Sequence, residues 1–519
     1  MIGAAGVLLV VAAIILSRHF EPYIRQQAIL YLENRFDSDV EIGALHTSLA
    51  PLSALRLLIP GRGVLVQVDG EQIVLHRHGQ SSAPPLLRLR HFSGSLDLAR
   101  LLAGMKRIRS ITLDGAEVNI PPRSDTTPHK KRSDGPTVVV DEVRIGNAVL
   151  NIMSKEADHA PLRFYLRNVR LDSAGRDVAM RYQAVLVNPK PPGEIRSSGT
   201  FGPWAEEEPA DTPLRGGYTF ENADLSVFRG IAGRLRSTGT FEGTLASITA
   251  RGEAYVPDFR LTSAGNAMPL STRFEVLVDG TNGNTQLKPV VATLGSTHFT
   301  TSGVIVKNQE QEHRSISLTA SMPAGNLQDV VRLGVKGPPT VAGILHLETR
   351  IVIPPSSAKV RDKLLLEGNF SVTQGRFLNT RIRQALESLS RHGQGEPGAS
   401  AADEEVAADI SGQFHMAGAE LTFERLNFAI PGAAVDVAGT FNSEAQNLAF
   451  RGVLMLQAKA SQTVTGWKRW LLKPFDPLLA NHGVGTYLHI KIDGDANSPH
   501  FGLDPQVFNR HREATASVR

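Results

Sequence analysis

Apolar and polar positions alternate along many short stretches of this chain, which is the pattern of half-buried β-strands. In the stretch 486–493 every second residue is a large aliphatic one, and 447–459 follows the same rule with Val453 and Met455 as exceptions. The clearest apolar sets are Phe274, Val276 and Val278; Ile316, Leu318, Ala320 and Met322; Leu448, Phe450, Leu454 and Leu456; and Leu488, Ile490 and Ile492. One side of each predicted strand therefore needs an apolar neighbour.

A short phrase of the type Ser/Ala/Thr-Gly-Thr-Phe returns within these alternating segments. It occurs at 198–201, 238–241 and 438–441, with looser forms at 368–370 and 412–414. We interpret it as a degenerate strand repeat.

Composition agrees with a chain of many short strands and excludes several classes of site. The 519 residues include 47 Gly and 30 Pro but only 6% aromatic residues, which favours frequent turns over helical bundles. The net charge of +4 arises from interspersed acidic and basic residues, so no nucleic-acid-binding stripe is predicted. The absence of cysteine removes disulfides, thiol catalysis and cysteine-ligated metal centres.

The amino terminus begins with an unbroken apolar run, residues 1–16. Residues 2–16 would span about 22 Å as a helix, less than the roughly 30 Å of a hydrocarbon core, so a cleaved signal peptide is an alternative. No small-x-small cleavage site follows, and Phe20 and Tyr23 can extend the run into an interfacial belt, which favours a retained anchor over 1–20. Arg18 lies on the carboxyl side of the run and alone would favour a cytoplasmic body; a true start further upstream would resolve this.

Helical spacing continues beyond this run. Ile24, Ala28, Leu32 and Phe36 recur at helical intervals, so an amphipathic helix is expected to end before Asp37.

Three long segments resemble the AsmA-like family of bacterial envelope proteins. The amino-terminal match reads LENRFDSDVEIGALHTSLAPLSALR from Leu32 and FSGSLDLARLLAGMKRIRSITLDGAEVNIPP up to Pro122. The central match runs from Arg215 to Leu261, beginning RGGYTFENADLSVF. The carboxyl-terminal match comprises DISGQFHMAGAELTFERLNFAIPGAAVDVAGTF from Asp409 and a segment ending in GTYLHIKIDGDANSPHFGLD at Asp504.

This resemblance implies a fold, a location and partners. AsmA-like proteins are anchored in the inner membrane and carry a periplasmic β-sheet bent into a long groove lined by apolar side chains. The resemblance therefore implies an elongated, curled, antiparallel or mixed sheet with a few short helices after one transmembrane helix. It also implies phospholipid traffic toward the outer membrane or support of outer-membrane assembly, with phospholipid acyl chains, the inner membrane, and the outer membrane or one of its assembly proteins as partners.

The apolar strand faces have two possible fates. They can pack inside closed sandwiches, or they can remain open to acyl chains, each buried methylene contributing about 0.8 kcal/mol. With the family resemblance, the open groove is the preferred hypothesis, and its candidate lining is Phe274, Val276, Val278, Ile316, Leu318, Phe450, Leu454, Leu456, Leu488, Ile490 and Ile492. A scaffold that pairs strand edges with an outer-membrane protein is the alternative function, and an envelope glycan enzyme is a distant third.

Polar breaks divide the chain into predicted modules. Between Thr380 and Arg391 the apolar spacing predicts a short amphipathic helix that caps the open sheet or packs on it. The predicted divisions are an anchor at 1–20, an amino-terminal module at 21–122, a linker at 123–136, a central β-repeat region at 137–391, a disordered linker at 392–408, a carboxyl-terminal region at 409–505 and a loose tail at 506–519.

The stretch 465–479 combines aromatic and basic residues. Trp467, Trp470 and Phe475 beside lysine and arginine suit a membrane interface, whereas a helix packed over the end of the sheet would use the same tryptophans as core residues. Both interpretations stay open for this segment.

Motifs for catalysis are missing from the sequence. It has no G-x-S-x-G, no G-x-x-x-x-G-K and no H-E-x-x-H, and 403–405 is a loose acidic run rather than a buried carboxylate pair. His76 and His78 share a spacing that could place two imidazoles on one strand face, but no third ligand follows. The chain is therefore predicted to be a non-enzyme without metal or cofactor.

Overall fold

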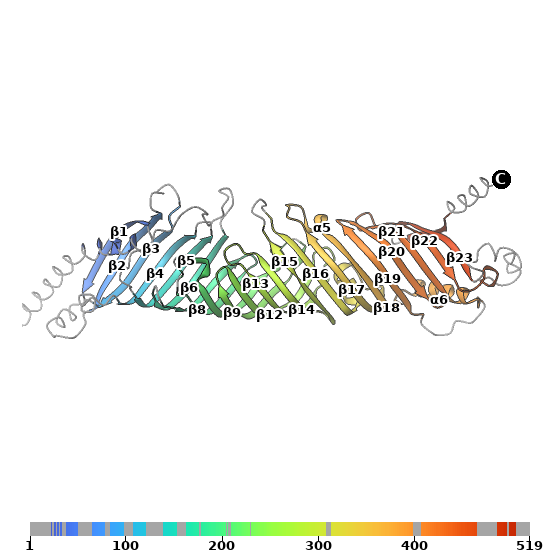
Figure 1. Cartoon of the computed structure of the whole chain (residues 1–519), viewed down its shortest axis with the longest axis horizontal. Coiled ribbons are helices and arrows are strands. Elements are labelled where there is room, and N and C mark those ends of the chain that lie inside the picture. The colour runs from blue at the N-terminus through green and yellow to red at the C-terminus, as the bar shows by residue number, and fades with distance from the viewer. Residues whose placement is uncertain are drawn as a thin grey trace, which may run out of the picture. The chain divides into compact units, whose positions relative to one another are not determined.

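A computed structural model describes most of the chain, and the described residues lie mainly in β-strands (Figure 1). The structure describes residues 22, 25–26, 28–30, 32–33, 38–49, 65–77, 84–97, 107–120, 139–152, 162–175, 178–203, 205, 209–228, 230–307, 313–397, 406–463, 485–495 and 498–504. The predicted anchor at 1–20, the linker at 123–136 and the tail at 506–519 lie outside these residues.

The strands form one 24-stranded sheet, and the chain divides into two compact units. Unit 1 comprises 1–224, 235–252 and 278–281, and unit 2 comprises 225–234, 253–277 and 282–519. The mainly β, curled sheet predicted from the sequence is thus confirmed.

The elements of unit 1 are β1 (Ser38–Leu49), β2 (Leu65–Arg77), β3 (Leu87–Asp97), β4 (Arg107–Ile120), β5 (Val139–Ile152), β6 (Leu162–Ala174), β7 (Met180–Pro189), β8 (Pro192–Phe201), η2 (Pro209–Asp211), β9 (Pro213–Asp224), most of β11 (Arg234–Thr244) and the first part of β12 (Ser247–Leu261). Those of unit 2 are η3 (Leu225–Val227), β10 (Ile231–Ala232), the rest of β12, most of β13 (Met268–Val278), β14 (Thr285–Leu294), β15 (Thr297–Val306), β16 (Ser315–Asn326), α4 (Leu327–Gly334), β17 (Val341–Ile353), α5 (Val360–Lys363), β18 (Leu365–Phe377), α6 (Thr380–Gln394), β19 (Ala408–Ala417), β20 (Glu420–Ile430), β21 (Ala433–Asn442), β22 (Asn447–Leu456), η4 (Ala460–Gln462), β23 (Thr486–Asp495) and β24 (Ser498–Leu503).

Strands pair mainly with their neighbours in the chain. From β14 to β24 every successive pair is antiparallel, as are the successive pairs from β5 to β9. The pair β4–β5 is parallel, with Ile111 opposite Val143, so the sheet is mixed, as predicted.

The register gives each unit an apolar face. In unit 2, Leu318 lies opposite Ile351, which in turn lies opposite Leu366. In unit 1, Leu75 lies opposite Leu87, and Leu89 lies opposite Ala116. Residues opposite one another point to the same side of the sheet, so these rows define what we call the inner face of each unit, and the other side is the outer face.

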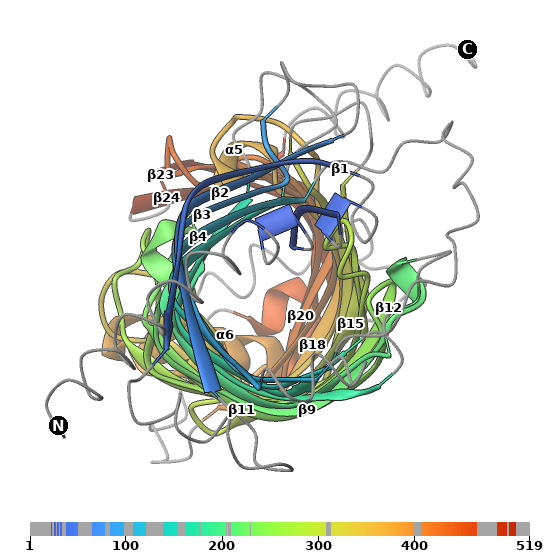
Figure 2. The same ribbon diagram turned by 90° about the vertical axis from the view of Figure 1, so that its left-hand side faces the viewer.

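Helices pack on the inner face of unit 2. Leu327 and Val330 of α4 contact a cluster of Met322, Leu345 and Val372. Leu386 and Leu389 of α6 contact a second cluster of Ala408, Ile430 and Ala433. Figure 2 shows α6 on the concave side of β18 and β20, so the inner face of unit 2 is the concave one.

The helix predicted over 380–391 is therefore confirmed, and it packs on the sheet. It continues to Gln394, and β19 begins at Ala408, so both ends of the predicted disordered linker are ordered; 398–405 lie outside the described residues.

In unit 1 the largest core cluster lies on the inner face and centres on β1–β5. Its members are Ile42, Leu45, Val66, Val68, Ile73, Leu75, Leu89, Ala116 and Ala148. Ala28 and Ile29 belong to the amphipathic helix predicted before Asp37, here called the exit helix, and they pack against this cluster. Arg25 of the same helix donates a hydrogen bond of 2.6 Å to the carbonyl oxygen of Ile42. Every described position from 22 to 33 is helical, in agreement with the prediction.

Among the residues that the structure describes, no helix has the length and apolar character needed to cross a membrane.

Candidate lipid-binding faces

The Gly-Thr-Phe repeat places a glycine and a phenylalanine on the inner face, two positions apart. At Gly239 a Cβ atom would lie 2.9 Å from Cε1 of Tyr218, and at Gly439 it would lie 2.8 Å from Cδ1 of Phe450. The looser copy at Gly412 has the ring of Phe370 at 2.9 Å. Glycine therefore leaves the space into which an aromatic side chain of the adjacent strand folds, which lets large rings fit on a concave surface.

The predicted groove residues of β22 and β23 lie side by side on the inner face. Phe450 is opposite Ile492, Gly452 is opposite Ile490, and Leu454 is opposite Leu488. Leu456 lies at the end of the same row and contacts the cluster under α6. The two exceptions to the alternation, Val453 and Met455, lie on the outer face.

The register also places the candidates from β16, and those from β13 are described by their burial. Ile316 and Leu318 lie opposite Ile353 and Ile351 on the inner face. Phe274, Val276 and Val278 of β13 are half-buried; the charged Arg273 and Glu275 precede Phe274 and Val276, and the half-buried Leu277 precedes Val278. Their neighbours Arg273 and Glu275 form ion pairs with Glu253 and Lys288 respectively.

Aromatic rings form a continuous row across the inner face of unit 2. The ring centroids of Phe370 and Phe414 are 6.2 Å apart, as are those of Phe370 and Phe423, and Phe423 and Phe450 are 5.9 Å apart. Tilted and edge-on contacts at these separations stabilise aromatic pairs by about 0.5–1.5 kcal/mol beyond area burial. The row links β18, β19, β20 and β22 with a wholly apolar band.

Charge is confined to the outer face in the register-matched rows of β14–β23. No position that these rows place on the inner face carries a charged side chain. The outer face carries ion pairs, including Arg350–Glu367 at 3.5 Å, Arg425–Asp436 at 3.6 Å and Lys491–Asp493 at 3.0 Å. Since an unpaired charge in an apolar environment costs several kcal/mol, this separation suits an apolar occupant on one side and water on the other.

Unit 1 has hydroxyl groups on its inner face, and these are hydrogen-bonded across strands. The hydroxyl of Tyr182 lies 3.0 Å from that of Ser197, and the hydroxyl of Tyr218 lies 3.1 Å from that of Ser237. Burial raises the pKa of both tyrosines, and the serine hydrogen bonds partly oppose that increase. Both tyrosines therefore expose an apolar ring to the inner face while their hydroxyl groups are hydrogen-bonded to serine.

The inner face reaches the last strand of unit 2. Phe501 and Leu503 of β24 lie opposite Ile492 and Ile490, and they are 74% and 56% exposed. These are among the most exposed large apolar side chains of the described residues, so the apolar rows continue to the last described strand.

Several predicted residues cannot be placed. Trp467, Trp470 and Phe475 lie outside the described residues, as does His78. His76 lies on β2, where its buried Nδ1 has no hydrogen-bond partner among the described residues. Within the described ranges no three histidine, aspartate or glutamate side chains are grouped as a metal site would require.

The sequence alone does not predict the parts of the site that depend on β-bulges and on which strands pair. At β20 a bulge between Phe423 and Leu426 moves the inward positions from odd to even numbers, which breaks strict alternation. The serine partners of Tyr182 and Tyr218 lie on the next strand, 15 and 19 residues away, and no local motif marks them. The glycines of the repeat are the sequence feature that marks where aromatic rings of adjacent strands pack.

Comparison with known proteins yields no match among family models, curated proteins or solved structures.

Proposed function

We propose that this protein is a membrane-anchored, periplasmic lipid-binding protein whose apolar inner faces hold phospholipid acyl chains and move them toward the outer membrane. The observation that carries this proposal is that the inner-face rows of β14–β23 carry no charged side chain, whereas the outer face of the same strands carries ion pairs.

The chemistry of the inner face favours alkyl chains over polar ligands. Its rows offer aliphatic and aromatic side chains with no charged group to anchor a polar molecule. Each methylene transferred from water to such a surface contributes about 0.8 kcal/mol, so an acyl chain of ordinary length gains enough to remain bound. Movement along the face is feasible because the binding energy is non-directional and similar from one row to the next.

The sequence resemblance supports the location in this proposal. The order of an apolar amino terminus, an exit helix and a strand containing Val40-Glu41-Ile42-Gly43 is that of AsmA-like proteins. A body in the periplasm, an anchor in the inner membrane and a non-enzymatic role are parts of the same proposal.

The direct test is retention of phospholipid through purification. The full chain is extracted in a mild detergent and analysed by native mass spectrometry, with extracted lipids counted per protein. We expect bound phospholipid in the wild type and a several-fold lower occupancy in Ile490→Glu, because the carboxylate would point into the apolar row beside Gly452.

Val453→Glu is the matched control, because Val453 lies on the outer face of the adjacent strand. Circular dichroism establishes that both variants keep their strands. Wild-type protein that emerges free of lipid, or equal loss in the two variants, contradicts the proposal.

One observation favours a second candidate function, a scaffold for outer-membrane protein assembly. The exposed Phe501 and Leu503 lie on β24, a six-residue strand that is the last described strand in the chain and pairs with β23. An incoming strand could add to the sheet beside it. A scaffold would bind no phospholipid in the native mass spectrum. Phe501→Asp would then abolish capture of an unfolded outer-membrane protein while lipid occupancy stays at zero.

A further inference from the structure

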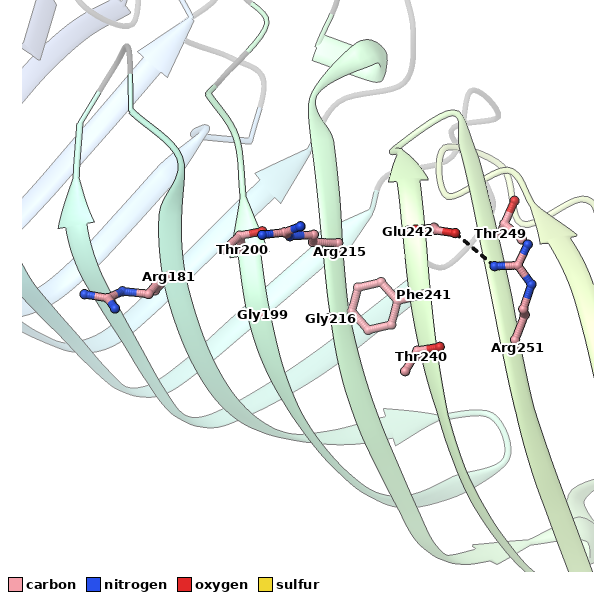
Figure 3. Close-up of a pocket in the computed structure, with 10 residues that line it drawn as sticks. All are labelled: Arg181, Gly199, Thr200, Arg215, Gly216, Thr240, Phe241, Glu242, Thr249 and Arg251. Atoms are coloured by element: carbon pink, nitrogen blue, oxygen red, sulfur yellow. Dashed lines mark hydrogen bonds and ion pairs between the residues drawn. The ribbon is translucent and has the colours of Figure 1, made fainter.

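We propose that the outer face of unit 1 carries a phosphate-binding site, separate from the lipid-binding inner faces. The site is a cavity of about 600 Å³ that spans β7, β8, β9, β11 and β12. Figure 3 shows Arg181, Arg215 and Arg251 around it, with the Glu242–Arg251 ion pair at one side. This volume falls within the usual range for small-molecule sites, which is about 300–1,000 Å³.

The strand register places two arginines on either side of one threonine. Arg181 lies opposite Thr200, and Thr200 lies opposite Arg215, so the three side chains form a row on the outer face. The two arginines are two strand spacings apart, roughly 9.6 Å, which allows both guanidinium groups to reach an anion held above Thr200. Arg215 already donates a hydrogen bond of 3.3 Å from Nε to the Thr200 hydroxyl.

The charges of these two arginines are not paired by a carboxylate among the described residues, and Asp172, which lies opposite Arg181 in the register, pairs with Arg170 instead. Neither Arg181 nor Arg215 forms an ion pair within the part of the chain that the structure describes. Arginines on neighbouring strands of the same face do: Arg167 and Arg196 both pair with Glu194. Arg251 is paired with Glu242 at 2.9 Å, so two of the three arginines that line the cavity have no ion-pair partner among the described residues.

The remaining lining consists of hydroxyl groups, two glycines and one aromatic residue. The hydroxyls of Thr200, Thr240 and Thr249 add hydrogen-bonding groups beside the arginines. Gly199 and Gly216, which lie opposite one another, and Phe241 complete the lining.

This combination identifies the ligand by its chemistry. Two guanidinium groups without an ion-pair partner among the described residues present planar pairs of N–H donors that match the oxygens of a phosphate, and hydroxyls complete its hydrogen bonds. The ligand is therefore a phosphate-bearing molecule, either a soluble phosphorylated compound or the headgroup of an anionic phospholipid.

The test measures binding of inorganic pyrophosphate to the full chain by isothermal titration calorimetry. We expect saturable binding that becomes at least tenfold weaker in Arg181→Ser/Arg215→Ser. The matched control is Arg167→Ser/Arg196→Ser, which removes the same charge from the same face outside the cavity and should change the Kd less than twofold.

A second variant protects the test against misfolding. Arg181→Lys/Arg215→Lys keeps the charge but loses the paired donors, and we expect an intermediate weakening with an unchanged circular dichroism spectrum.

Sedimentation with phosphatidylglycerol or phosphatidylcholine vesicles distinguishes a phospholipid headgroup from a soluble phosphorylated compound. Phosphatidylglycerol binding that depends on Arg181 and Arg215 identifies a headgroup, and its absence beside pyrophosphate binding identifies a soluble ligand. No saturable binding of either probe, or equal weakening in the cavity and control variants, overturns the proposal.

Discussion

At Gly239 the missing side chain makes room for the ring of Tyr218 on the next strand. A Cβ there would lie 2.3 Å from the carbonyl oxygen of Arg251 and 2.9 Å from the Tyr218 ring. Gly217, on β9, has room for a methyl group, because the nearest atom to its Cβ would be a carbonyl oxygen at 3.6 Å, an ordinary van der Waals distance. Neighbouring glycines in one region therefore have different tolerances for a methyl group.

Gly239→Ala should destabilise unit 1, whereas Gly217→Ala should not. Inserting a methyl group into a filled space costs about 1–3 kcal/mol, and a substitution into open space usually changes stability by less than about 0.5 kcal/mol. Hydrogen exchange of the β9 and β11 amides measures the free energy of local opening for both variants. Equal values for the two would show that the ring of Tyr218 does not need this space.

Alkaline pH should weaken unit 1 through Tyr182 and Tyr218. Their folded-state pKa values are raised by burial, so the folded protein keeps protons that the unfolded chain loses above about pH 10. The stabilisation is present below that pH and is lost as pH rises through the folded pKa. Thermal unfolding between about pH 9 and pH 11.5 should therefore show a smaller alkaline loss in Tyr182→Phe/Tyr218→Phe than in wild type. Identical slopes would contradict this assignment.

Individual strands could be predicted from alternation alone, and the reason lies in their half-buried environment. Leu488, Ile490 and Ile492 share the inner face, as predicted, because one side of β23 packs on apolar neighbours and the other carries Lys491. Alternation does not show which strands pair, so the arginine row on β7–β9 was not predictable. The parallel pair β4–β5 also has no local signature.

Helix α6 is held by both apolar and polar contacts. Ser390 donates a hydrogen bond of 2.7 Å to the carbonyl oxygen of Pro431, and the Ala458 amide donates one of 2.7 Å to that of Gly393. These contacts fix the carboxyl-terminal half of α6 at the end of the inner face, which sets a boundary for any acyl chain bound there.

Leu389→Asp should detach α6 from the sheet, because it places a charge in the cluster of Ile430 and Ala433. Ile382→Asp is the control, since Ile382 is 40% exposed on the same helix. Hydrogen exchange should become faster by an order of magnitude or more across 380–394 in the first variant only. The strands β20 and β21 should keep their protection, and unchanged exchange in α6 would contradict the packing.

At the scale of the whole molecule, most contacts join strands that are neighbours in the chain. The strongest pairings from β14 onward are all between successive strands. Proteins whose segments contact only their neighbours behave as linear arrays of coupled elements, and their cooperativity decays along the array.

Differential scanning calorimetry should therefore depart from two-state unfolding. We expect a calorimetric enthalpy clearly larger than the van't Hoff enthalpy, since different groups of strands melt at different temperatures. A ratio of one would indicate that all strands unfold together.

Pairing between successive strands also has an evolutionary consequence. Each strand from β15 to β23 pairs mainly with the strands before and after it, and pairs such as β14–β15 and β20–β21 are joined by short turns. Duplication of one hairpin would supply its own glycine and aromatic residues, and it would leave every other pairing intact. Deletion of a hairpin would likewise let the flanking strands pair with each other. Such a gene can change its number of strands in steps of two, so relatives of very different size can descend from one ancestor without passing through an unfolded intermediate.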